Sequence, residues 1–471
     1  MKTKNYVRTI AGLTLATSMA VPFNSWAKDS LALKLDYSLS TPLKSKVERS
    51  HQVSDSNKLG MTRIFEAIVE TDSSYAAARH EAEAVRQRLH MAEAAKGARV
   101  DATGGLYHTQ SFSGNESGAG GNLMINLTYP IYRQENNINM TKAEIQVQLA
   151  ELRTLLARQD LVLRTATNYF DILSVQVNAK IDEAQVSYLR KTYDLEKIRF
   201  DRGLGTKQNV TRLEAELRIA EAQSQKSKSD LDSRTYDLSQ RTGLKIKSLK
   251  MVSENAPISE PSPNNREAWA DQAAKDSLIV RSQDSLYELS KQDIGLARAA
   301  YSPYVYFGAS AGIDRTSKNH SMFSSNSSTS RGATVGVYMT IPLYDGGSRS
   351  AATRESGAMS EKFLEDRRGA ETAITSQARE NFTATISSIE KSHALKSAYT
   401  VAKDNYTTTA EGYQSGTSTL TDMLQAQQMM FQTRRDYNLE RMSAIVASLK
   451  LKFTSGQLSE ADLALIDKIL E

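Results

Sequence analysis

Two different spacings of apolar residues alternate along the chain. Apolar residues three and four positions apart, the spacing of one helix face, recur in six segments: 61–96, 136–202, 207–242, 266–299, 348–412 and 419–453. Apolar and polar residues alternate one by one, as in a strand with one apolar face, in four shorter segments: 99–110, 122–131, 303–313 and 333–343. The sequence therefore predicts a mixed fold of long helices and two pairs of strands.

The longest helical segment carries the repeat of a coiled coil. Ten of twelve positions from Ile145 to Ala184, taken alternately four and three residues apart, are apolar, which is typical of a coiled-coil seam. No Pro or Gly interrupts residues 136–202, so this helix would be about 100 Å long. Gly203 and Gly205 end it. We therefore expect coiled-coil hairpins of long helices.

The strands are predicted to cross a membrane. Segment 122–131 has the length that crosses a bilayer as a tilted strand, about ten residues. Segments 112–121 and 314–331, rich in Ser, Gly and Asn, are predicted to be loops facing the cell exterior. Membrane barrels start at about eight strands, and hydrocarbon does not tolerate open strand edges. Two or three chains are therefore expected to associate, with their charged helices in the periplasm.

Tyrosines gather around the predicted strands. Eight of the 20 lie in or beside them: Tyr107, Tyr129, Tyr132, Tyr301, Tyr304, Tyr306, Tyr338 and Tyr344. In a membrane barrel they would form aromatic girdles at the two interfaces. In a soluble sheet they would only reflect the strand propensity of tyrosine. An export signal at the N-terminus favours the membrane.

That export signal occupies residues 1–27. Lys2, Lys4 and Arg8 precede an apolar stretch too short to span a bilayer, and Ser25-Trp26-Ala27 offers a small-x-small cleavage site. Residues 28–60 follow as a flexible polar extension. A Pro-rich linker at 254–265 separates two predicted repeats, 61–253 and 266–471.

Composition excludes several classes of protein. The 471 residues hold no cysteine, which excludes a disulfide scaffold, a thiolate metal site and a lipidated N-terminal cysteine. The mean hydropathy of -0.46 and the lack of a later long apolar run exclude a helical membrane protein. Three basic residues of the signal supply most of the net charge of +5, so no nucleic-acid partner is expected.

The two halves repeat one order of elements: strand, loop, strand, long helix, turn and helix. Pro130-Ile131-Tyr132 matches Pro342-Leu343-Tyr344 in the second half. The tip turn ending at Gly203 matches the turn ending at Gly416. This internal duplication is the strongest organisational signal in the sequence.

These motifs, taken in order, resemble the TolC family of trimeric outer-membrane channel-tunnels over residues 61–470. Pro342-Leu343-Tyr344 followed by Asp345-Gly346-Gly347 resembles the family's strand-to-helix junction, and the copy that begins at Pro130 has lost the Asp-Gly-Gly. Tyr413-Gln414-Ser415-Gly416 and the following residues 420–427 resemble the family's periplasmic tip. Residues 449–463 resemble its ending.

The resemblance implies a homotrimer with a twelve-stranded barrel and an α-helical tunnel. Such a channel is the passive exit duct of a tripartite export system, docked to a periplasmic adaptor and an inner-membrane ABC or proton-driven transporter. Many efflux members carry a lipidated cysteine. Its absence here favours the branch that serves type I protein secretion as well as multidrug efflux.

The resemblance also implies a gate at the periplasmic tip. Asp422 and Gln425 match two family positions that form acidic rings, and Tyr413 matches a tyrosine in the closing hydrogen bonds. Ser418 replaces an arginine, and Gln208-Asn209 replace a threonine and an aspartate. We therefore expect a sparser, less charged network. Thr419 and Asp422 also read as a capping box, so Asp422 could serve as cap, gate or both.

No catalytic chemistry is evident. The six histidines form no metal-ligand pair, no nucleophile–base set is present, and Gly203-Leu204-Gly205 lacks the context of a phosphate loop. We expect no enzyme activity, no cofactor and no metal. The alternative to an export channel is a periplasmic or surface coiled-coil structural protein without a pore, and the paired alternating strands argue against it.

Overall fold

The computed structural model describes residues 59–110, 117–253, 258–321 and 324–471. The predicted signal peptide 1–27 and residues 28–58 of the polar extension lie outside the described residues. So do 111–116 and 254–257, which belong to one predicted loop and to the predicted linker.

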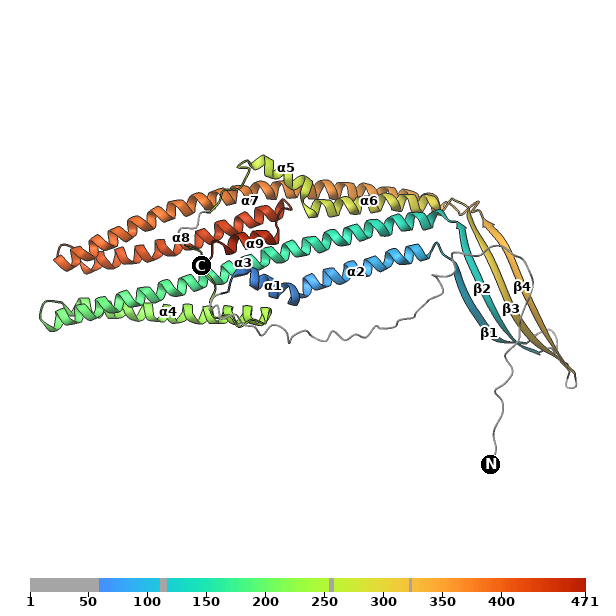
Figure 1. The fold of residues 1–471 in the computed structure, drawn as a ribbon, viewed down its shortest axis with the longest axis horizontal. Helices are drawn as coiled ribbons and strands as arrows, with labels where there is room; N and C mark the ends of the chain where they lie inside the picture. The colour runs from blue at the N-terminus through green and yellow to red at the C-terminus, as the bar shows by residue number, and fades with distance from the viewer. Residues whose placement is uncertain (1–58, 111–116, 254–257, 322–323) are drawn as a thin grey trace, which may run out of the picture. The chain divides into compact units, whose positions relative to one another are not determined.

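Helices make up most of the described chain (Figure 1). They are α1 Met61–Thr71, α2 Ser73–Ala94, α3 Gln134–Asp201, α4 Lys207–Thr242, α5 Arg266–Asp276, α6 Leu278–Ala299, α7 Ser348–Ser415, α8 Leu420–Thr454 and α9 Glu460–Asp467. The strands are β1 Arg99–Gln110, β2 Ser117–Tyr132, β3 Tyr304–Ser321 and β4 Ser324–Thr340. The predicted fold of long helices and four strands is confirmed.

The long helices pair within each half of the chain. Helix α3 packs along α4, and α7 packs along α8, while α2 and α6 lie against α3 and α7 respectively (Figure 1). Helices α3 and α7 each contain 68 residues. Each half therefore contributes one long hairpin that is extended by a shorter helix.

Two segments predicted as single helices are each divided in two. Asp72 separates α1 from α2, because its carboxylate accepts a hydrogen bond from the Tyr75 amide and caps α2. Ser277 separates α5 from α6, with extended backbone at ψ 126°. The apolar spacing continues across both breaks, so the periodicity alone did not reveal them.

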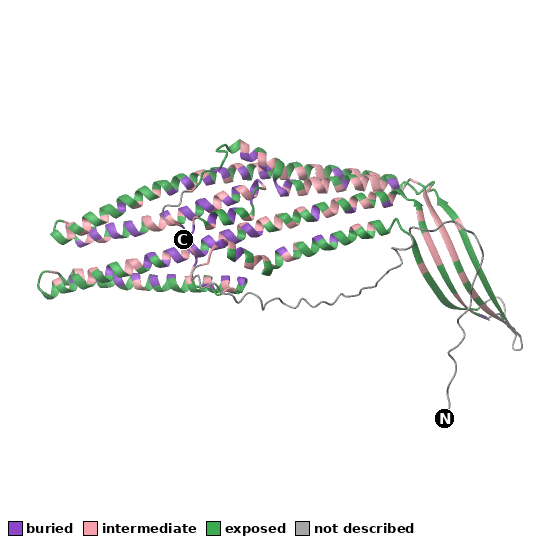
Figure 2. Cartoon of the chain, in the orientation of Figure 1, coloured by how far each residue is buried: buried purple, intermediate pink, exposed green. Residues whose placement is uncertain are grey.

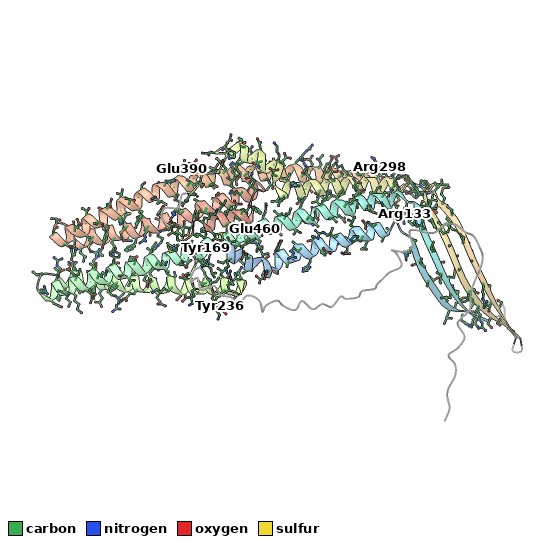
Figure 3. The ribbon with its side chains drawn as sticks, viewed as in Figure 1. Arg133, Tyr169, Tyr236, Arg298, Glu390 and Glu460 are labelled. Carbon is green, nitrogen blue, oxygen red and sulfur yellow. The ribbon has the colours of Figure 1, made fainter. Side chains whose placement is uncertain are left out.

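The four strands form one antiparallel sheet in the order β1-β2-β3-β4. Because neighbours are antiparallel, the starts of β1 and β3 and the ends of β2 and β4 lie at the same side of the sheet. All four connections to helices leave from that side, where Arg133 and Arg298 lie (Figure 3). The sheet thus has a helix-connected end and a hairpin end.

The prediction of a loop at 314–331 is wrong for most of this segment. Strands β3 and β4 continue through it, with Asp314 opposite Ser330 and Arg315 opposite Thr329. Strand β2 likewise begins at Ser117, inside the loop predicted at 112–121. The ladder consists of backbone hydrogen bonds, which Ser and Thr side chains do not prevent. Polar composition marked the end of the apolar face rather than the end of the strands.

The sheet has an apolar and a polar face. The apolar face exposes large side chains on β2 and β4, namely Leu123, Ile125, Val335, Val337 and Met339. On the polar face, the Tyr107 hydroxyl lies 3.3 Å from the Asp314 carboxylate and 3.2 Å from the Thr316 hydroxyl. This two-sided pattern is that of a barrel wall between lipid and a water-filled lumen.

Four tyrosines expected in membrane girdles lie on the polar face instead. Tyr306 stacks on Tyr304 and on Tyr338, with 5.1 Å between ring centroids in each pair. A Cβ atom added at Gly308 would lie 3.0 Å from the Tyr338 ring. Strand alternation puts Tyr107 on the same face, whereas Tyr129 lies on the apolar face. The girdle interpretation is wrong for the four, because composition does not report which face a residue occupies.

Buried residues lie along the helices and are nearly lacking from the described strands (Figure 2). The largest core cluster packs α1, α3, α8 and α9 against residues 244–252. Within it Tyr169 is 1% exposed and donates to the backbone carbonyls of Leu59 and Lys250. Burial raises the pKa of its hydroxyl. Among the described helices, none is both long and apolar enough to cross a membrane.

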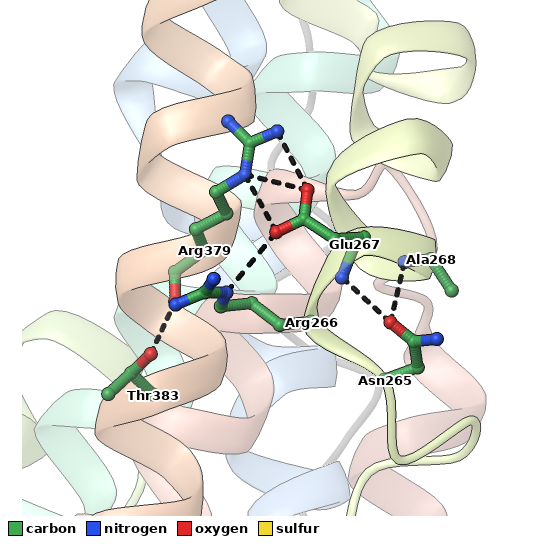
Figure 4. A network of polar contacts seen from close by, with 6 residues as sticks. All are labelled: Asn265, Arg266, Glu267, Ala268, Arg379 and Thr383. Atoms are coloured by element: carbon green, nitrogen blue, oxygen red, sulfur yellow. Dashed lines mark hydrogen bonds and ion pairs between the residues drawn. The ribbon is translucent and has the colours of Figure 1, made fainter.

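A surface ion pair holds the short helix α5 on α7. The Arg379 guanidinium donates to both carboxylate oxygens of Glu267, at 2.8 to 3.3 Å, and Asn265 caps α5 nearby (Figure 4). The arginine lowers the pKa of the Glu267 carboxyl. The pair is exposed, so it orients α5 more than it stabilises the fold.

The glycines under the polar-face tyrosines give a testable prediction. In Gly120→Ala the new Cβ would lie 2.5 Å from the Tyr107 ring. The ring must therefore move and lose its contacts with Asp314 and Thr316, at a cost of about 1 kcal/mol. We expect a lower temperature for the heat-induced loss of sheet structure, measured by circular dichroism in detergent.

Gly332→Ala is the matched control for this prediction. Gly332 also lies on the polar face of the sheet, but an added Cβ there would meet no atom within 4 Å. Equal transition temperatures for the two variants would show that the contact between Tyr107 and Gly120 does not constrain the sheet.

Candidate functional site

Both long hairpins turn at the end farthest from the sheet. Helix α3 ends in a turn that contains Gly203 at φ +74°, and α7 ends at Gly416 at φ +83°. Both angles lie in the left-handed region, which favours glycine. The predicted tip turns at Gly203 and Gly416 are therefore present, and their geometry explains the residue type.

A buried carboxylate joins the two hairpins at these tips. Glu196 of α3 is 2% exposed and accepts a hydrogen bond of 2.5 Å from the Tyr413 hydroxyl of α7. Its other oxygen accepts from the Asn209 side-chain amide of α4 at 3.2 Å. The Arg199 guanidinium lies 3.9 Å from the carboxylate and 5.3 Å from the centre of the Tyr413 ring. The site is thus a small polar network between three helices.

Burial keeps the tyrosine of this network in its neutral form. Burial, together with the Glu196 carboxylate, raises the pKa of Tyr413 to about 12. The tyrosine therefore remains a hydrogen-bond donor over the whole neutral range. Leu189, Leu213 and Leu420 belong to a buried apolar cluster that packs against Tyr413, and Glu196 is itself nearly inaccessible to solvent. In such surroundings an unpaired carboxylate is costly, so Glu196 favours the state in which the hairpins touch.

Two further polar contacts connect the hairpins. Near the tip, the Arg212 guanidinium of α4 donates to the Thr421 hydroxyl of α8 at 2.7 Å. Farther along α3, Asp182 is 2% exposed and accepts from Arg435 of α8 at 2.6 Å. Ser227 of α4 donates to the other oxygen of Asp182 at 2.5 Å. The hairpins are therefore fastened at two heights, about 20 Å apart along α3.

Asp422 forms the predicted capping box. Its amide donates to the Thr419 hydroxyl at 3.2 Å, and its carboxylate accepts from the Thr419 amide at 3.1 Å. The Thr419 hydrogen bonds lower the pKa of the carboxyl. Asp422 and Gln425 are both exposed and lie three residues apart on one face of α8. The carboxylate is thus available to a copy of the chain or to ions while it caps the helix.

The other predicted tip residues divide into two groups. Tyr413 and Asn209 meet at Glu196. Ser418 instead closes the tip turn through its amide, which donates to the Gly412 carbonyl at 3.1 Å, and Gln208 is exposed on the outside of α4. Neither of the last two contributes to the network within one chain.

Glu196 was missed by the sequence reasoning. A signal was present, since Leu189, Tyr193, Glu196 and Phe200 recur at the four-three-four spacing of one helix face. A single carboxylate in an otherwise apolar stripe indicates a buried polar contact. The partner of that contact lies 217 residues away, on the other hairpin.

The strand-to-helix junctions differ between the halves. After Pro342, the Asp345 carboxylate accepts from the amides of Gly347 and Arg349 and thereby caps α7. These hydrogen bonds, chiefly that of the Arg349 amide, lower the pKa of Asp345. Gly346 and Gly347 have φ of +69° and +89°, which explains the Gly-Gly pair.

The first-half junction uses a different device. The β2–β3 register shifts between Pro130 and Tyr132, and the following Arg133 lies 5.0 Å over the Tyr304 ring. Asn136 then donates to the Ala95 carbonyl at 2.7 Å. Side-chain contacts to neighbouring elements replace the lost Asp-Gly-Gly.

The chain matches a known family in both halves. The outer membrane efflux protein family matches residues 67–243 and 269–457. The chain belongs to this family. Its members are outer-membrane channels, so the protein is a channel and not an enzyme. The alternative of a coiled-coil structural protein without a pore is therefore wrong.

Individual relatives agree with the family. The chain is 24% identical over 344 residues to the alkaline protease secretion protein AprF of Pseudomonas aeruginosa, covering 73% of this chain and 71% of AprF. It is 24% identical over 353 residues to the outer membrane protein TolC of Escherichia coli, covering 74% and 71%. The TolC-like resemblance is confirmed.

A solved structure supports the fold. The outer membrane protein VceC of Vibrio cholerae matches with a TM-score of 0.68 and 16% identity, covering 84% of this chain and 96% of VceC. The protein therefore lies in the cell outer membrane, with its helices in the periplasm. The apolar face of the sheet contacts lipid, and the polar face lines the lumen.

The contact between Tyr413 and Glu196 gives a prediction for the tip. Tyr413→Phe keeps the ring but removes the hydroxyl donor to a buried carboxylate, at a cost of about 1–3 kcal/mol. We expect the hairpins to separate more often and the single-channel conductance in planar bilayers to rise. Tyr406→Phe is the matched control, because the Tyr406 hydroxyl forms no hydrogen bond with any residue that the structure describes.

The pH dependence checks the same contact. The pKa of Tyr413 is raised from 10 to about 12, so its stabilising contribution is complete below pH 10 and is lost as the pH rises to 12. The difference in thermal stability between the wild type and Tyr413→Phe should therefore shrink across this window. A difference that stays constant, or a conductance like that of Tyr406→Phe, would contradict the assignment.

Asp422→Asn separates the cap from the gate. Loss of the carboxylate weakens the capping box, so the thermal midpoint should fall. If copies of Asp422 also gather at the tunnel entrance, cation selectivity and block by divalent cations should fall in planar bilayers. Asp404→Asn, an exposed carboxylate on α7 without a capping role, should change neither property. Unchanged selectivity with lower stability would make Asp422 a cap alone.

Proposed function

We propose that three copies of this chain form one channel, with a twelve-stranded barrel and a continuous helical tunnel. The observation that carries the proposal is the open sheet of four strands, with β1 and β4 at its edges. Hydrocarbon does not tolerate unpaired strand edges, and membrane barrels start at about eight strands. Leu106 of β1 and Val335 of β4 are exposed, at 93% and 67%, as expected of a lipid-facing wall.

The channel would act as the passive exit duct of a tripartite export system. The two hairpins of each chain would bring six coiled coils to the periplasmic end, where a periplasmic adaptor and an inner-membrane ABC or proton-driven transporter would engage. In the described part of the chain no group of His, Asp and Glu side chains could hold a metal. Energy for transport would come from the transporter.

Two classes of cargo are supported. The name of AprF refers to alkaline protease secretion, and the name of the matched family refers to efflux. We therefore propose type I protein secretion, multidrug efflux or both. In a strain without its own channel, this protein should restore secretion of an alkaline protease, extrusion of a cationic fluorescent dye, or both. Correct outer-membrane insertion with neither activity would reject the export role.

The trimer predicts the size of the purified particle. In detergent, light scattering corrected for bound detergent should give a protein mass three times that of the mature chain. An unboiled sample should migrate on a gel as one slow species that boiling converts to the monomer. A monomer with heat-resistant sheet structure, or a dimer, would contradict the twelve-stranded barrel.

A further inference from the structure

Two arginines break the apolar face of the sheet near its hairpin end. Strand alternation runs without a bulge from Val305 to Arg315 of β3, so Arg315 shares the lipid face with Val305 and Ile313. Asp314 and Thr316, on either side of Arg315, both contact Tyr107 on the lumen face. These contacts place Arg315 on the opposite, lipid-facing side.

Arg331 of β4 lies on the same face beside Arg315. Ile313 is opposite Arg331, and Thr329 is opposite Arg315. The two arginines are therefore diagonal neighbours on adjacent strands, with Cα atoms about 7–8 Å apart. Both are exposed, and neither has a hydrogen-bond or ion-pair partner within the residues that the structure describes.

The lipid face offers no negative charge to balance them. In the described strands, no Asp or Glu occupies a position of this face. Each chain thus presents two unpaired positive charges side by side at the end of the apolar face, next to Thr329. Unpaired charges at the edge of hydrocarbon need an anionic partner or water.

The height of the pair locates it in the membrane. Arg315 lies ten residues from Val305, which is about 33 Å along the strand and about 25 Å along the membrane normal at the usual tilt. That is the height of the apolar band of such barrels. Since Val305 lies at the helix-connected, periplasmic end, the arginines lie at the outer edge of the bilayer.

The lipid face directly below the arginines is apolar. Leu123 and Ile313 lie level with Arg331, and Ile125, Ala311 and Ala333 form the next row down. Leu123 and Ile125 expose their side chains on this face. A headgroup held by the arginines would therefore have apolar side chains beneath it to contact its acyl chains.

We propose that Arg315 and Arg331 bind the phosphate groups of the phosphorylated glycolipid in the outer leaflet. A guanidinium binds phosphate through two parallel N–H donors, and two adjacent guanidinium groups match a doubly charged headgroup. The site would position the barrel in the membrane rather than act on cargo. The proposal rests on the outer-membrane location of the protein and is independent of what the channel exports.

The test measures lipid binding to the full chain purified in detergent. Native mass spectrometry would compare diphosphoryl lipid A, phosphatidylglycerol and inorganic phosphate as probes. We expect diphosphoryl lipid A to bind best, and Arg315→Gln/Arg331→Gln to weaken it about tenfold or more. The matched control is Arg88→Gln/Arg234→Gln, which removes two exposed helical arginines without described partners and should leave binding unchanged.

Several results would overturn the proposal. These are unchanged affinity of the double Gln variant, equal loss in the helical control, equal affinity for phosphatidylglycerol, or binding of inorganic phosphate as tightly as of the lipid. If the double Gln variant does not fold, Arg315→Lys/Arg331→Lys keeps the charge but loses the paired donors. It should bind several-fold more weakly, and wild-type affinity in this variant would also refute the assignment.

Discussion

Everything in this channel depends on the need to pair every backbone N–H and C=O group within hydrocarbon. A four-stranded sheet satisfies that need internally but leaves β1 and β4 with open edges. The proposed association of three copies would pair those edges, so the membrane part of each chain would be completed by its neighbours. The helices face no such requirement, because their backbone groups are paired within each helix. They can therefore carry charges on their surfaces and use side chains such as Glu196 to hold one hairpin against the other.

Sequence periodicity located the helices and strands because burial and lipid contact repeat with the geometry of the backbone. Periodicity misplaced the ends of the strands where apolar contacts stop but the backbone hydrogen bonds continue. Strands β3 and β4 extend through a serine-rich stretch, since their ladder does not depend on apolar side chains. The prediction of aromatic girdles failed for a different reason. The number of tyrosines suggested a membrane interface, yet Tyr306 and Tyr338 stack on the lumen face, which only the register of the strands reveals.

The tip shows what the sequence could and could not give. Asp422 was identified as a capping residue because the cap is made of groups three residues apart. Tyr413 was identified through resemblance, but its partner was not, because Glu196 reaches it only when two distant hairpins fold together. The spacing rule for a capping box finds only contacts between residues close in sequence. A contact between residues 217 positions apart can be located only in the folded structure, although a lone carboxylate in an apolar stripe indicates that such a contact exists.

The equal length of α3 and α7 has a mechanical consequence. Both helices contain 68 residues, and each is fastened to the opposite hairpin through side chains at set positions along it. Seven residues inserted into α3 alone would carry Glu196 about 10 Å away from Tyr413. A change in reach across the periplasm is therefore accessible only when both halves lengthen in step. The contacts between the hairpins therefore couple the lengths of the two halves, so that the length of one limits the length of the other.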